Sequence, residues 1–574
     1  MSRSGTRRQS KARLPRTFFG TLAFVTLLFG LAVYSQARLQ IRDRSEVLKK
    51  AEDAWMVARE RDVPADRGTI YSADMRVLAQ SKPQYDFWLF YDRVPCTPGF
   101  FMALAEAAGV PEARLSTPYR EGKKRTWLEP LGSDRYKAVR QVMTDWGADG
   151  ISLDETNARE YPLREAAVGI VGWMHEGLAR SGIELSFDKA LSGQDGRAQS
   201  IVGLNGRDAS STGAEDGLLH GSDVVLTIDS SLQAAAAAAV RNAVEKHGAT
   251  SGAIVVMVPS SGDVLAMANW PAFDPLVGPK GGSELVTPYM EDLQPGSTFK
   301  VLTLAKALDM GVVDETYSFN CPGVFDLGRQ RLVKCDEHGG SRSHGLIGLD
   351  KAIGKSCNIA AAQWALKIGR DPMIAFMRDV GLLSKPDIGL PGAVTPIFDM
   401  NEWDKQRQLA VLGFGQSIAV PPLSLAGAVA MIANDGEYVA PRLVSQVGGK
   451  RVSPSAPKRV VSPQAAQLAR RYMESVVHAD FGTGKTLAIP GYRIAGKTGT
   501  AQKLGPGGGH VSSFVGMFPA DKPQILVLVV INDPKQGAIY GSLVAGPPFV
   551  EVANAAISRL NIRRLPATVA PTHT

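Results

Sequence analysis

The hydrophobic pattern of the chain opens with one continuous apolar stretch. Residues 17–37 carry no charged side chain and are rich in Phe, Leu, Val and Ala, which is enough to cross about 30 Å of hydrocarbon as a helix. A cleaved signal peptide is the alternative, but the stretch is long for a signal core and Ser35-Gln36-Ala37 is a poor cleavage site. Both interpretations export the rest of the chain. We expect one membrane-spanning helix, because no second comparable stretch follows.

Beyond this stretch the pattern is mixed. Residues 37–65 are charged and lack turn signals, which predicts a helical stem. Residues 67–79 favour a strand, a turn and a strand, whereas the polar runs 192–196 and 207–217 are typical of loops. The region has no obvious nucleophile, so we interpret it as a structural pedestal.

Apolar runs at both ends of the following region predict a single sheet. A strand at 223–229, an alanine-rich helix near 232–245 and a hairpin within 253–268 come first. Strands at 513–518 and 525–531 come last, and helical segments fill the middle. This order indicates an α/β (α+β) fold, in which one sheet is assembled from distant parts of the chain and helices pack on it.

The length of 574 residues supports more than one domain. Hydrophobic residues make up 44% and charged residues 21%, close to globular averages, so most of the chain should fold. In chain order we expect a basic cytoplasmic tail at 1–16, the membrane helix at 17–37, the pedestal at 38–222, a second domain at 223–563 and a disordered tail at 564–574.

The net charge of +8 is concentrated at the amino terminus. The first sixteen residues contain no acid and six basic side chains, namely Arg3, Arg7, Arg8, Lys11, Arg13 and Arg16. A basic flank before an apolar helix keeps the tail in the cytoplasm and sends the bulk of the chain outside. The charge therefore indicates a membrane topology and not a nucleic-acid partner.

Four cysteines in the whole chain argue against a disulfide-rich scaffold. Cys321 and Cys335 are close enough in sequence to bridge a loop in an oxidising compartment. His338 and His344 follow them, which suggests zinc, but a paired Cys-x-x-Cys is missing. We expect no metal.

The first candidate chemistry is the motif Ser297-Thr298-Phe299-Lys300. It follows Gln294-Pro295-Gly296 and precedes an apolar helical run, which predicts that Ser297 lies in the first turn of a helix after a sharp bend. Residues three apart share a helix face, so the Lys300 amine should reach the Ser297 hydroxyl. Lys300 can take the proton of this hydroxyl only if the pKa of the lysine itself is lowered. Burial and a second cation, for which Lys497 is the candidate, would lower it. An ordinary helix start is the alternative, and the same spacing recurs at Ser186 to Lys189 and Ser455 to Lys458.

The second motif is Ser356-Cys357-Asn358, in a turn that enters another helix. Ser356 is a candidate proton relay between Lys300 and a leaving amine, and Asn358 is a candidate ligand for a substrate amide. The alternative is a serine that caps the helix. Cys357 is most simply a small buried spacer.

The third motif is Lys497-Thr498-Gly499. Residues 491–498 also match the phosphate-binding P-loop pattern, but a P-loop must open into a helix, and glycine follows here instead. We favour a strand whose glycine lets a peptide pair along its backbone. Lys497, Thr498 and Thr500 could then hold a terminal carboxylate, and the backbone N–H groups of Ser297 and Thr500 could form an oxyanion hole.

With these motifs in this order, the chain resembles the class B penicillin-binding proteins, which are membrane-anchored peptidoglycan transpeptidases. The resemblance extends to Asp263 to Ala268, Gly413 to Gln416 and Ala495 to Gln502. The ending Val529 to Pro534, with Tyr540-Gly541, is most similar to the cell-division members.

The pedestal matches this family less closely. Tyr161-Pro162 and Gly182-Ile183-Glu184 look like its amino-terminal motifs, but Met75 and Arg164 stand where the family usually has glycine. These departures affect partner contacts more than catalysis.

The resemblance implies a β-lactamase/transpeptidase-like domain with an antiparallel sheet, behind a dimerisation-like pedestal. It implies that Ser297, deprotonated by Lys300, attacks the D-Ala-D-Ala amide of a stem peptide, and that a neighbouring amine then takes the acyl group. The implied catalytic residues are Ser297, Lys300, Ser356, Asn358 and Lys497, and the implied substrate-binding residues are Thr498, Gly499 and Thr500. No cofactor is required.

The resemblance also implies the partners of the chain. These are peptidoglycan stem peptides, β-lactam antibiotics, a membrane glycosyltransferase and other division proteins at the bacterial inner membrane. Septal cell-wall synthesis is the expected role. An elongation-type transpeptidase, a carboxypeptidase or β-lactamase, and a non-catalytic penicillin-binding scaffold are the alternatives.

Overall fold

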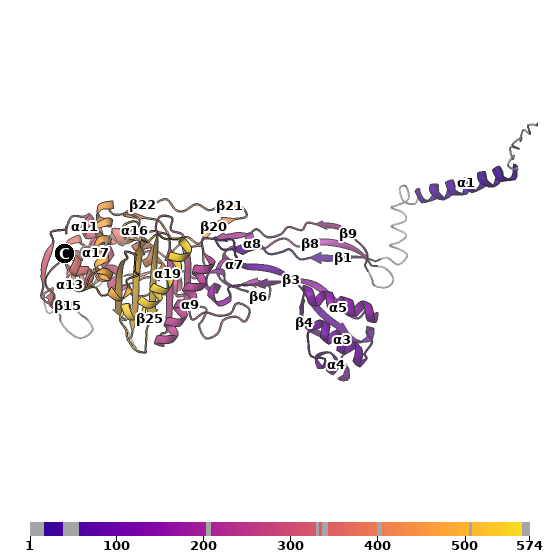
Figure 1. The fold of residues 1–574 in the computed structure, drawn as a ribbon, viewed down its shortest axis with the longest axis horizontal. Helices are drawn as coiled ribbons and strands as arrows, with labels where there is room; N and C mark the ends of the chain where they lie inside the picture. The colour runs from indigo at the N-terminus through magenta and orange to yellow at the C-terminus, as the bar shows by residue number, and fades with distance from the viewer. Residues whose placement is uncertain are drawn as a thin grey trace, which may run out of the picture. The chain divides into compact units, whose positions relative to one another are not determined.

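The computed structural model describes residues 16–37, 57–202, 208–328, 332–335, 343–398, 405–503 and 508–564. The chain divides into two compact units, each made of separate stretches of sequence (Figure 1). Unit 1 comprises residues 1–65, 85–154 and 194–219, and unit 2 comprises residues 66–84, 155–193 and 220–574.

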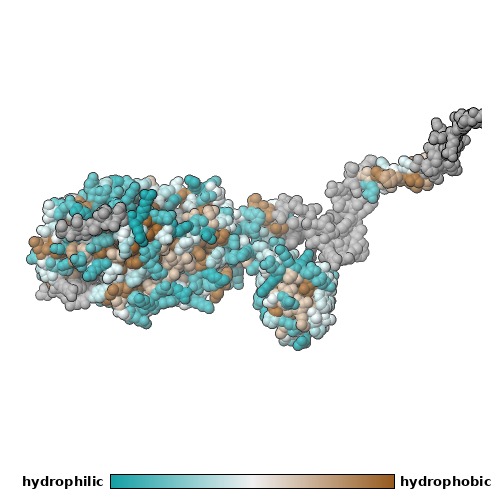
Figure 2. Space-filling view, viewed as in Figure 1, coloured by the Kyte–Doolittle hydropathy of each residue, from teal (hydrophilic) through white to brown (hydrophobic). Residues whose placement is uncertain are grey.

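The apolar stretch near the amino terminus forms helix α1 (Arg16–Ala37), which confirms the predicted helix. Its described side chains are exposed, including Phe24, Leu27 and Phe29 (Figure 2). Among the helices of the described residues, none is both long and apolar enough to cross a membrane.

Unit 1 contains a small antiparallel sheet and a separate helical core. Strands β1 (Val57–Val63), β8 (Gly196–Val202) and β9 (Asp208–Asp216) pair in the order β1-β8-β9. Helices α3 (Pro98–Ala108) and α5 (Ser133–Trp146) pack together with strand β4 (Arg125–Gly132). Their core includes the fully buried Phe87, Phe100 and Leu128.

Two of these strands correct the sequence analysis. β1 occupies the end of the predicted helical stem, whose earlier part lies outside the described residues, and β9 replaces a predicted loop. Both strands are polar and pair through their backbones, so the spacing of apolar residues gives no sign of them. The strand, turn and strand predicted at 67–79 are confirmed by β2 (Ile70–Tyr71) and β3 (Val77–Phe90), which pair antiparallel.

Unit 2 is built on a five-stranded antiparallel sheet in the order β12-β11-β25-β24-β23 (Figure 1). The strands are β11 (Ser251–Met257), β12 (Val264–Trp270), β23 (Ala495–Gln502), β24 (His510–Phe518) and β25 (Ile525–Asn532). The predicted hairpin and the predicted carboxy-terminal strands are confirmed. The assembly of one sheet from distant parts of the chain is also confirmed, except for its first predicted strand. That strand, predicted at 223–229, is β10 (Val224–Leu226), which pairs with β2 and β20 (Val444–Val447) in a separate sheet.

Alternate residues of β25 pack into two different cores, because helices cover both faces of the sheet. Val527, Val529 and Ile531 share one core with helices α9 (Ser230–His247) and α19 (Gly546–Leu560). Leu526 and Leu528 belong to the larger core on the other face. The helices of that core include α11 (Lys300–Asp309), α13 (Asn358–Ile368), α16 (Pro422–Ala433) and α17 (Pro463–His478). The first two motifs therefore lie on this side of the sheet.

A buried ion network in unit 2 joins the family-like motifs of the amino-terminal region. The Glu184 side chain has no exposed surface and accepts hydrogen bonds from Arg67 Nε at 2.6 Å and Arg159 Nε at 2.7 Å. The Tyr161 hydroxyl donates to the same carboxylate at 3.4 Å. A Cβ at Gly68 would lie 2.1 Å from the Ser222 carbonyl oxygen, so only glycine fits beside Arg67. These motifs hold separate segments of unit 2 together.

Candidate active site

The Ser297 motif lies after a sharp bend, as the sequence predicts. Gly296 has φ of +54°, and a Cβ there would lie 2.8 Å from Cβ of Ala501, so both backbone conformation and space favour glycine. A single 3-10 turn, η4 (Gly296–Phe299), leads into α11. This turn leaves Ser297 partly exposed while Lys300 is buried.

The Gly413-Phe414-Gly415-Gln416 segment braces this bend. The Gly296 N–H donates to the Gly415 carbonyl at 3.1 Å, and a Cβ at Gly415 would lie 2.2 Å from the Gly296 oxygen. The Thr303 hydroxyl, one turn into α11, donates to the Gly413 carbonyl at 2.8 Å. The segment therefore fixes the start of the helix that carries Lys300.

The Lys300 side chain points at the second motif. Its Nζ donates to the Ser356 carbonyl at 2.6 Å, to Ser356 Oγ at 3.0 Å and to Asn358 Oδ1 at 2.6 Å. Ser356 lies in the predicted turn with φ of +59°, between α12 (Leu349–Gly354) and α13. The helix-capping alternative for Ser356 is wrong, because the N-cap position of α13 is Cys357.

Lys497 of β23 also reaches Ser356. Its side chain has no exposed surface, and its Nζ donates to Ser356 Oγ at 2.9 Å and to the Thr498 carbonyl at 3.0 Å. Burial, and then the positive charge of Lys300, holds the pKa of Lys497 well below its ordinary value. The Ser356 hydroxyl thus joins two buried lysines.

Thr498, Thr500 and Ala501 of β23 line the active-site cavity. The P-loop interpretation is excluded, because Thr498 continues along this strand instead of starting a helix. The hydroxyls of Thr498 and Thr483 lie 2.8 Å apart, and the Thr500 hydroxyl accepts from the Gly541 N–H at 3.1 Å. A Cβ at Gly499 would lie 2.2 Å from Ser513 Oγ and 3.0 Å from Cγ2 of Thr298. Only glycine therefore lets β23 lie this close to η4.

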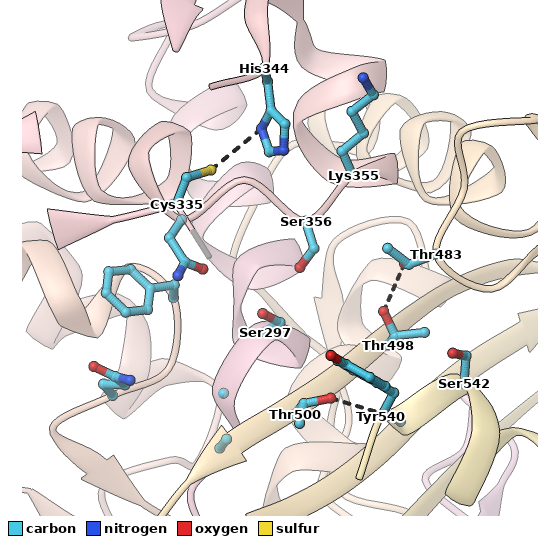
Figure 3. A pocket seen from close by; sticks show the side chains of 16 residues that line it. Ser297, Cys335, His344, Lys355, Ser356, Thr483, Thr498, Thr500, Tyr540 and Ser542 are labelled. Carbon is cyan, nitrogen blue, oxygen red and sulfur yellow. Dashed lines mark hydrogen bonds between the residues drawn. The ribbon is translucent and has the colours of Figure 1, made fainter. Parts of the chain in front are cut away.

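These elements enclose one cavity of about 300 Å³ in unit 2 (Figure 3). Ser297 and Ser356 line it on one side, and Thr498 and Thr500 line it on the β23 side. The other lining residues are Gly296, Cys335, His344, Lys355, Asn358, Phe414, Gln416, Thr483, Ala501, Tyr540, Gly541 and Ser542. The Cys357 thiol, with help from His344 and Lys300, lowers the pKa of the Cys335 thiol in this wall.

The chain matches two known family models, one for each part of its length. Residues 252–555 match the penicillin-binding protein transpeptidase domain, and residues 62–226 match the penicillin-binding protein dimerisation domain. The chain belongs to the class B penicillin-binding proteins. This confirms the resemblance seen in the sequence.

Curated relatives extend the match over most of this penicillin-binding protein. The peptidoglycan D,D-transpeptidase FtsI of Escherichia coli is 30% identical over 533 residues, covering 88% of this chain and 85% of the relative. PenA of Neisseria meningitidis is 27% identical, covering 97% and 95%. Stage V sporulation protein D of Bacillus subtilis is 29% identical, covering 94% and 86%. The chain is a serine-type peptidoglycan D,D-transpeptidase, as predicted.

Solved structures agree with this assignment. Penicillin-binding protein 3 of Mycobacterium tuberculosis, in complex with aztreonam, is 25% identical with a TM-score of 0.66, covering 89% of this chain and 99% of that one. Penicillin-binding protein 2X of Streptococcus thermophilus is 20% identical with a TM-score of 0.72, covering 88% and 80%, and shows the fold alone.

The sequence analysis did not single out every residue at the cavity of this penicillin-binding protein. Thr483 and Ser542 line it from segments without catalytic spacing, and Lys355 lines it directly before the Ser356 motif, outside the motif's own pattern. Thr483 reaches Thr498 only because the turn after α17 folds back on β23. Only the fold brings it to the site.

Proposed function

We propose that Ser297 is the nucleophile of this transpeptidase, Lys300 its base and Ser356 the proton relay to the leaving amine. Asn358 and Lys497 would hold Lys300 and Ser356 in place. One observation carries the proposal: Lys300, Ser356, Asn358 and Lys497 are joined by hydrogen bonds of 2.6 to 3.0 Å, and Ser297 lines the same cavity as Ser356 and Asn358.

The reaction follows from these positions in two steps. Ser297 Oγ loses its proton to Lys300 and bonds to the carbonyl carbon of the D-Ala-D-Ala amide, whose C–N bond breaks. The departing D-Ala amine takes a proton through Ser356. An acceptor amine of a neighbouring strand then attacks the ester, and the Ser297 oxygen regains a proton as the ester C–O bond breaks.

The third motif would bind the donor peptide. β23 stands at the end of the strand order of its sheet, which supports addition of an extended peptide along its backbone. Thr498 and Thr500 would bind the terminal carboxylate of the donor peptide. Gly499 has no side chain and would leave the backbone of β23 open to that peptide. The N–H groups of Ser297 and Thr500 would stabilise the oxyanion, since both residues line the cavity.

The test is the intact mass of the full-length chain, purified in detergent and incubated with benzylpenicillin. We expect a single stable adduct on the wild-type chain and none on Ser297→Ala. Ser186→Ala is the matched control, because the exposed Ser186 shares the Ser-x-x-Lys spacing and lies outside the cavity. An adduct that survives in Ser297→Ala contradicts the proposal, and rapid turnover without an adduct indicates a β-lactamase.

We also propose a septal role at the inner membrane, with residues 17–37 as the anchor and the tail 1–16 in the cytoplasm. The similarity to FtsI at 30% identity and the basic amino-terminal tail support it. A partner glycosyltransferase and other division proteins belong to the same proposal. A tagged chain that stays at the cell periphery and does not gather at midcell would contradict the septal role and favour elongation.

A further inference from the structure

Four side chains beside the catalytic motifs converge on one point. Cys321 ends strand β13 (Ser318–Cys321), Cys335 follows β15 (Leu332–Lys334), His344 precedes β16 (Gly345–Gly348), and Cys357 begins α13. Their sulfur and ring nitrogen atoms all lie within 4.8 Å of one another. Figure 3 shows the Cys335 thiol directed at the His344 ring.

The distances within this cluster are those of a tetrahedron. The Cys321 and Cys335 sulfurs are 3.7 Å apart, those of Cys335 and Cys357 are 3.3 Å apart, and those of Cys357 and Cys321 are 3.7 Å apart. The Cys335 sulfur lies 3.4 Å from His344 Nδ1. A tetrahedral zinc ion with its usual bond lengths requires edges of about 3.7 Å between sulfurs and about 3.5 Å from sulfur to nitrogen.

We propose that these three cysteine sulfurs and Nδ1 of the histidine bind one zinc ion. The ligand set of three thiolates and one imidazole suits zinc, which favours sulfur and nitrogen at four-coordinate sites. The cysteines are 0%, 6% and 1% exposed, and four protein ligands leave no open position on a tetrahedral ion, as in structural sites. The three thiols lose their protons when the ion binds, which gives the site a net charge of −1.

A disulfide explains the same cluster less well. It would use two of the three sulfurs and leave the third thiol and the imidazole without a reason to converge. The three sulfurs lie 3.3 to 3.7 Å from one another, so none of them stands apart as it would beside a bonded pair. In the described residues the cysteines are free.

The sequence analysis expected no metal because a Cys-x-x-Cys pair is absent. The fold instead takes one ligand from the end of each of two strands, one from the start of a third and one from a helix N-terminus. It also gives Cys357, interpreted from the sequence as a buried spacer, a second function. His338, the other histidine considered, lies outside the described residues.

The position of the ion would matter for the active site. Cys357 stands between Ser356 and Asn358, the two residues that accept hydrogen bonds from Lys300. The Asn358 amide also donates to the Lys334 carbonyl at 3.1 Å, one residue before Cys335. An ion bound here would hold both segments beside Lys300, so the four ligands are positioning residues. This consequence rests on the proposed function, whereas the metal site itself does not.

The first experiment measures metal in the full-length chain, purified in detergent under reducing conditions without chelator. Mass spectrometry of metals should find one zinc per chain, and Cys357→Ala and Cys321→Ser should lose it. Cys96→Ser is the matched control, because Cys96 lies in unit 1 and should leave the zinc content unchanged. A chain without zinc overturns the proposal, whether its cysteines are free thiols or, after oxidation, its intact mass is two hydrogens lighter for each disulfide.

A second measurement does not depend on variants that may lose their fold by themselves. Cobalt exchanged into the wild-type chain should give the intense sulfur-to-cobalt absorption and the visible bands of a tetrahedral site. Absence of these bands, together with alkylation of all four cysteines in the folded chain, overturns the site. Protection of three cysteines that chelation removes supports it.

The positioning role has its own readout. Removal of zinc by a chelator should lower the rate of acylation of Ser297 by benzylpenicillin on the order of tenfold, and added zinc should restore it. An unchanged rate after zinc has left overturns the positioning role. A zinc-loaded chain that benzylpenicillin never acylates contradicts the proposed catalytic roles and leaves the metal site standing.

Discussion

Lys497 donates a 2.9 Å hydrogen bond to the hydroxyl of Ser356 from a side chain without exposed surface. The same hydroxyl accepts from Lys300 at 3.0 Å. A hydroxyl oxygen has two lone pairs and one proton, so two lysine donors direct the Ser356 proton away from both of them. This arrangement suits a relay that hands its proton to a leaving amine in the cavity.

The lowered pKa of Lys497 gives a pH prediction. Burial and the Lys300 charge both oppose protonation of Lys497, so its amine becomes neutral at a lower pH than that of a free lysine. Because Lys300 and Lys497 share the Ser356 hydroxyl, a neutral Lys497 can take up, through Ser356, a proton that Lys300 receives from Ser297. The rate of acylation by benzylpenicillin should therefore rise with pH and level off below the ordinary lysine range of about 10.4. Stopped-flow acylation between pH 5 and pH 11 measures this, and a midpoint at the ordinary lysine value would contradict it.

Removal of the Lys497 amine tests its role beside Ser356. Lys497→Ala should lower acylation by about 10² to 10⁴-fold, since it removes a hydrogen-bond donor to the Ser356 relay. Lys522→Ala, an exposed lysine in the loop before β25, is the control and should acylate as the wild type does. A fall of less than tenfold for Lys497→Ala would show that Ser356 does not need this donor.

The close approach of Ser513, on the neighbouring strand β24, to Gly499 of β23 predicts a rescue. In Gly499→Ala the new methyl group meets Ser513 Oγ at 2.2 Å, which should displace β23, lower acylation on the order of tenfold and lower the free energy of unfolding by about 1–3 kcal/mol. Adding Ser513→Ala removes that oxygen and should recover part of both losses.

Gly132→Ala serves as the control for the methyl group itself, because a Cβ there meets nothing within 4 Å. Acylation of this control should equal that of the wild type. If the double variant is no better than Gly499→Ala alone, contact with Ser513 is not the reason for glycine at this position.

The catalytic motifs could be found from the sequence because each combines fixed spacing with a local structural context. Ser297 at a helix start and Lys497 on a strand are properties of neighbouring residues. The partners of Lys300 could not be derived in this way, because Asn358 reaches it from a separate helix. Thr483 and the convergence of Cys357 with Cys321 likewise depend on long-range packing. Apolar spacing also missed the polar strands β1 and β9, which only their backbone pairing specifies.

The buried ion network predicts a large loss of stability from a conservative change. Glu184→Gln leaves the Arg67 and Arg159 guanidinium groups, 12% and 7% exposed, without their shared negative charge. Breaking a buried ion pair from one side costs about 3–5 kcal/mol, and thermal or urea unfolding of the full-length chain should show a loss of this size. The control is Asp379→Asn, whose partner Lys458 is largely exposed, and its effect should be small. Equal stability of the two variants would assign the network no structural role.

The two positions where the family usually has glycine keep a left-handed backbone in this chain. Met75 has φ of +56° and Arg164 has φ of +42°. Arg164 also pairs with Asp274 at 2.7 Å, but Met75 is 60% exposed, so little packing depends on its side chain. A left-handed conformation costs a residue with a Cβ about 1–2 kcal/mol. Glycine avoids this cost, but it raises the conformational entropy of the unfolded chain, which cancels part of the gain in stability.

Met75→Gly should therefore raise the free energy of unfolding by about 0.5–1 kcal/mol. Met75→Ala keeps the Cβ and removes the same exposed side chain, so it should not share this gain. Urea unfolding of the two variants side by side isolates the backbone contribution, because they differ only in the Cβ. If the alanine variant is as stable as the glycine variant, Met75 carries no backbone strain, and the family's usual glycine at this position must have another reason.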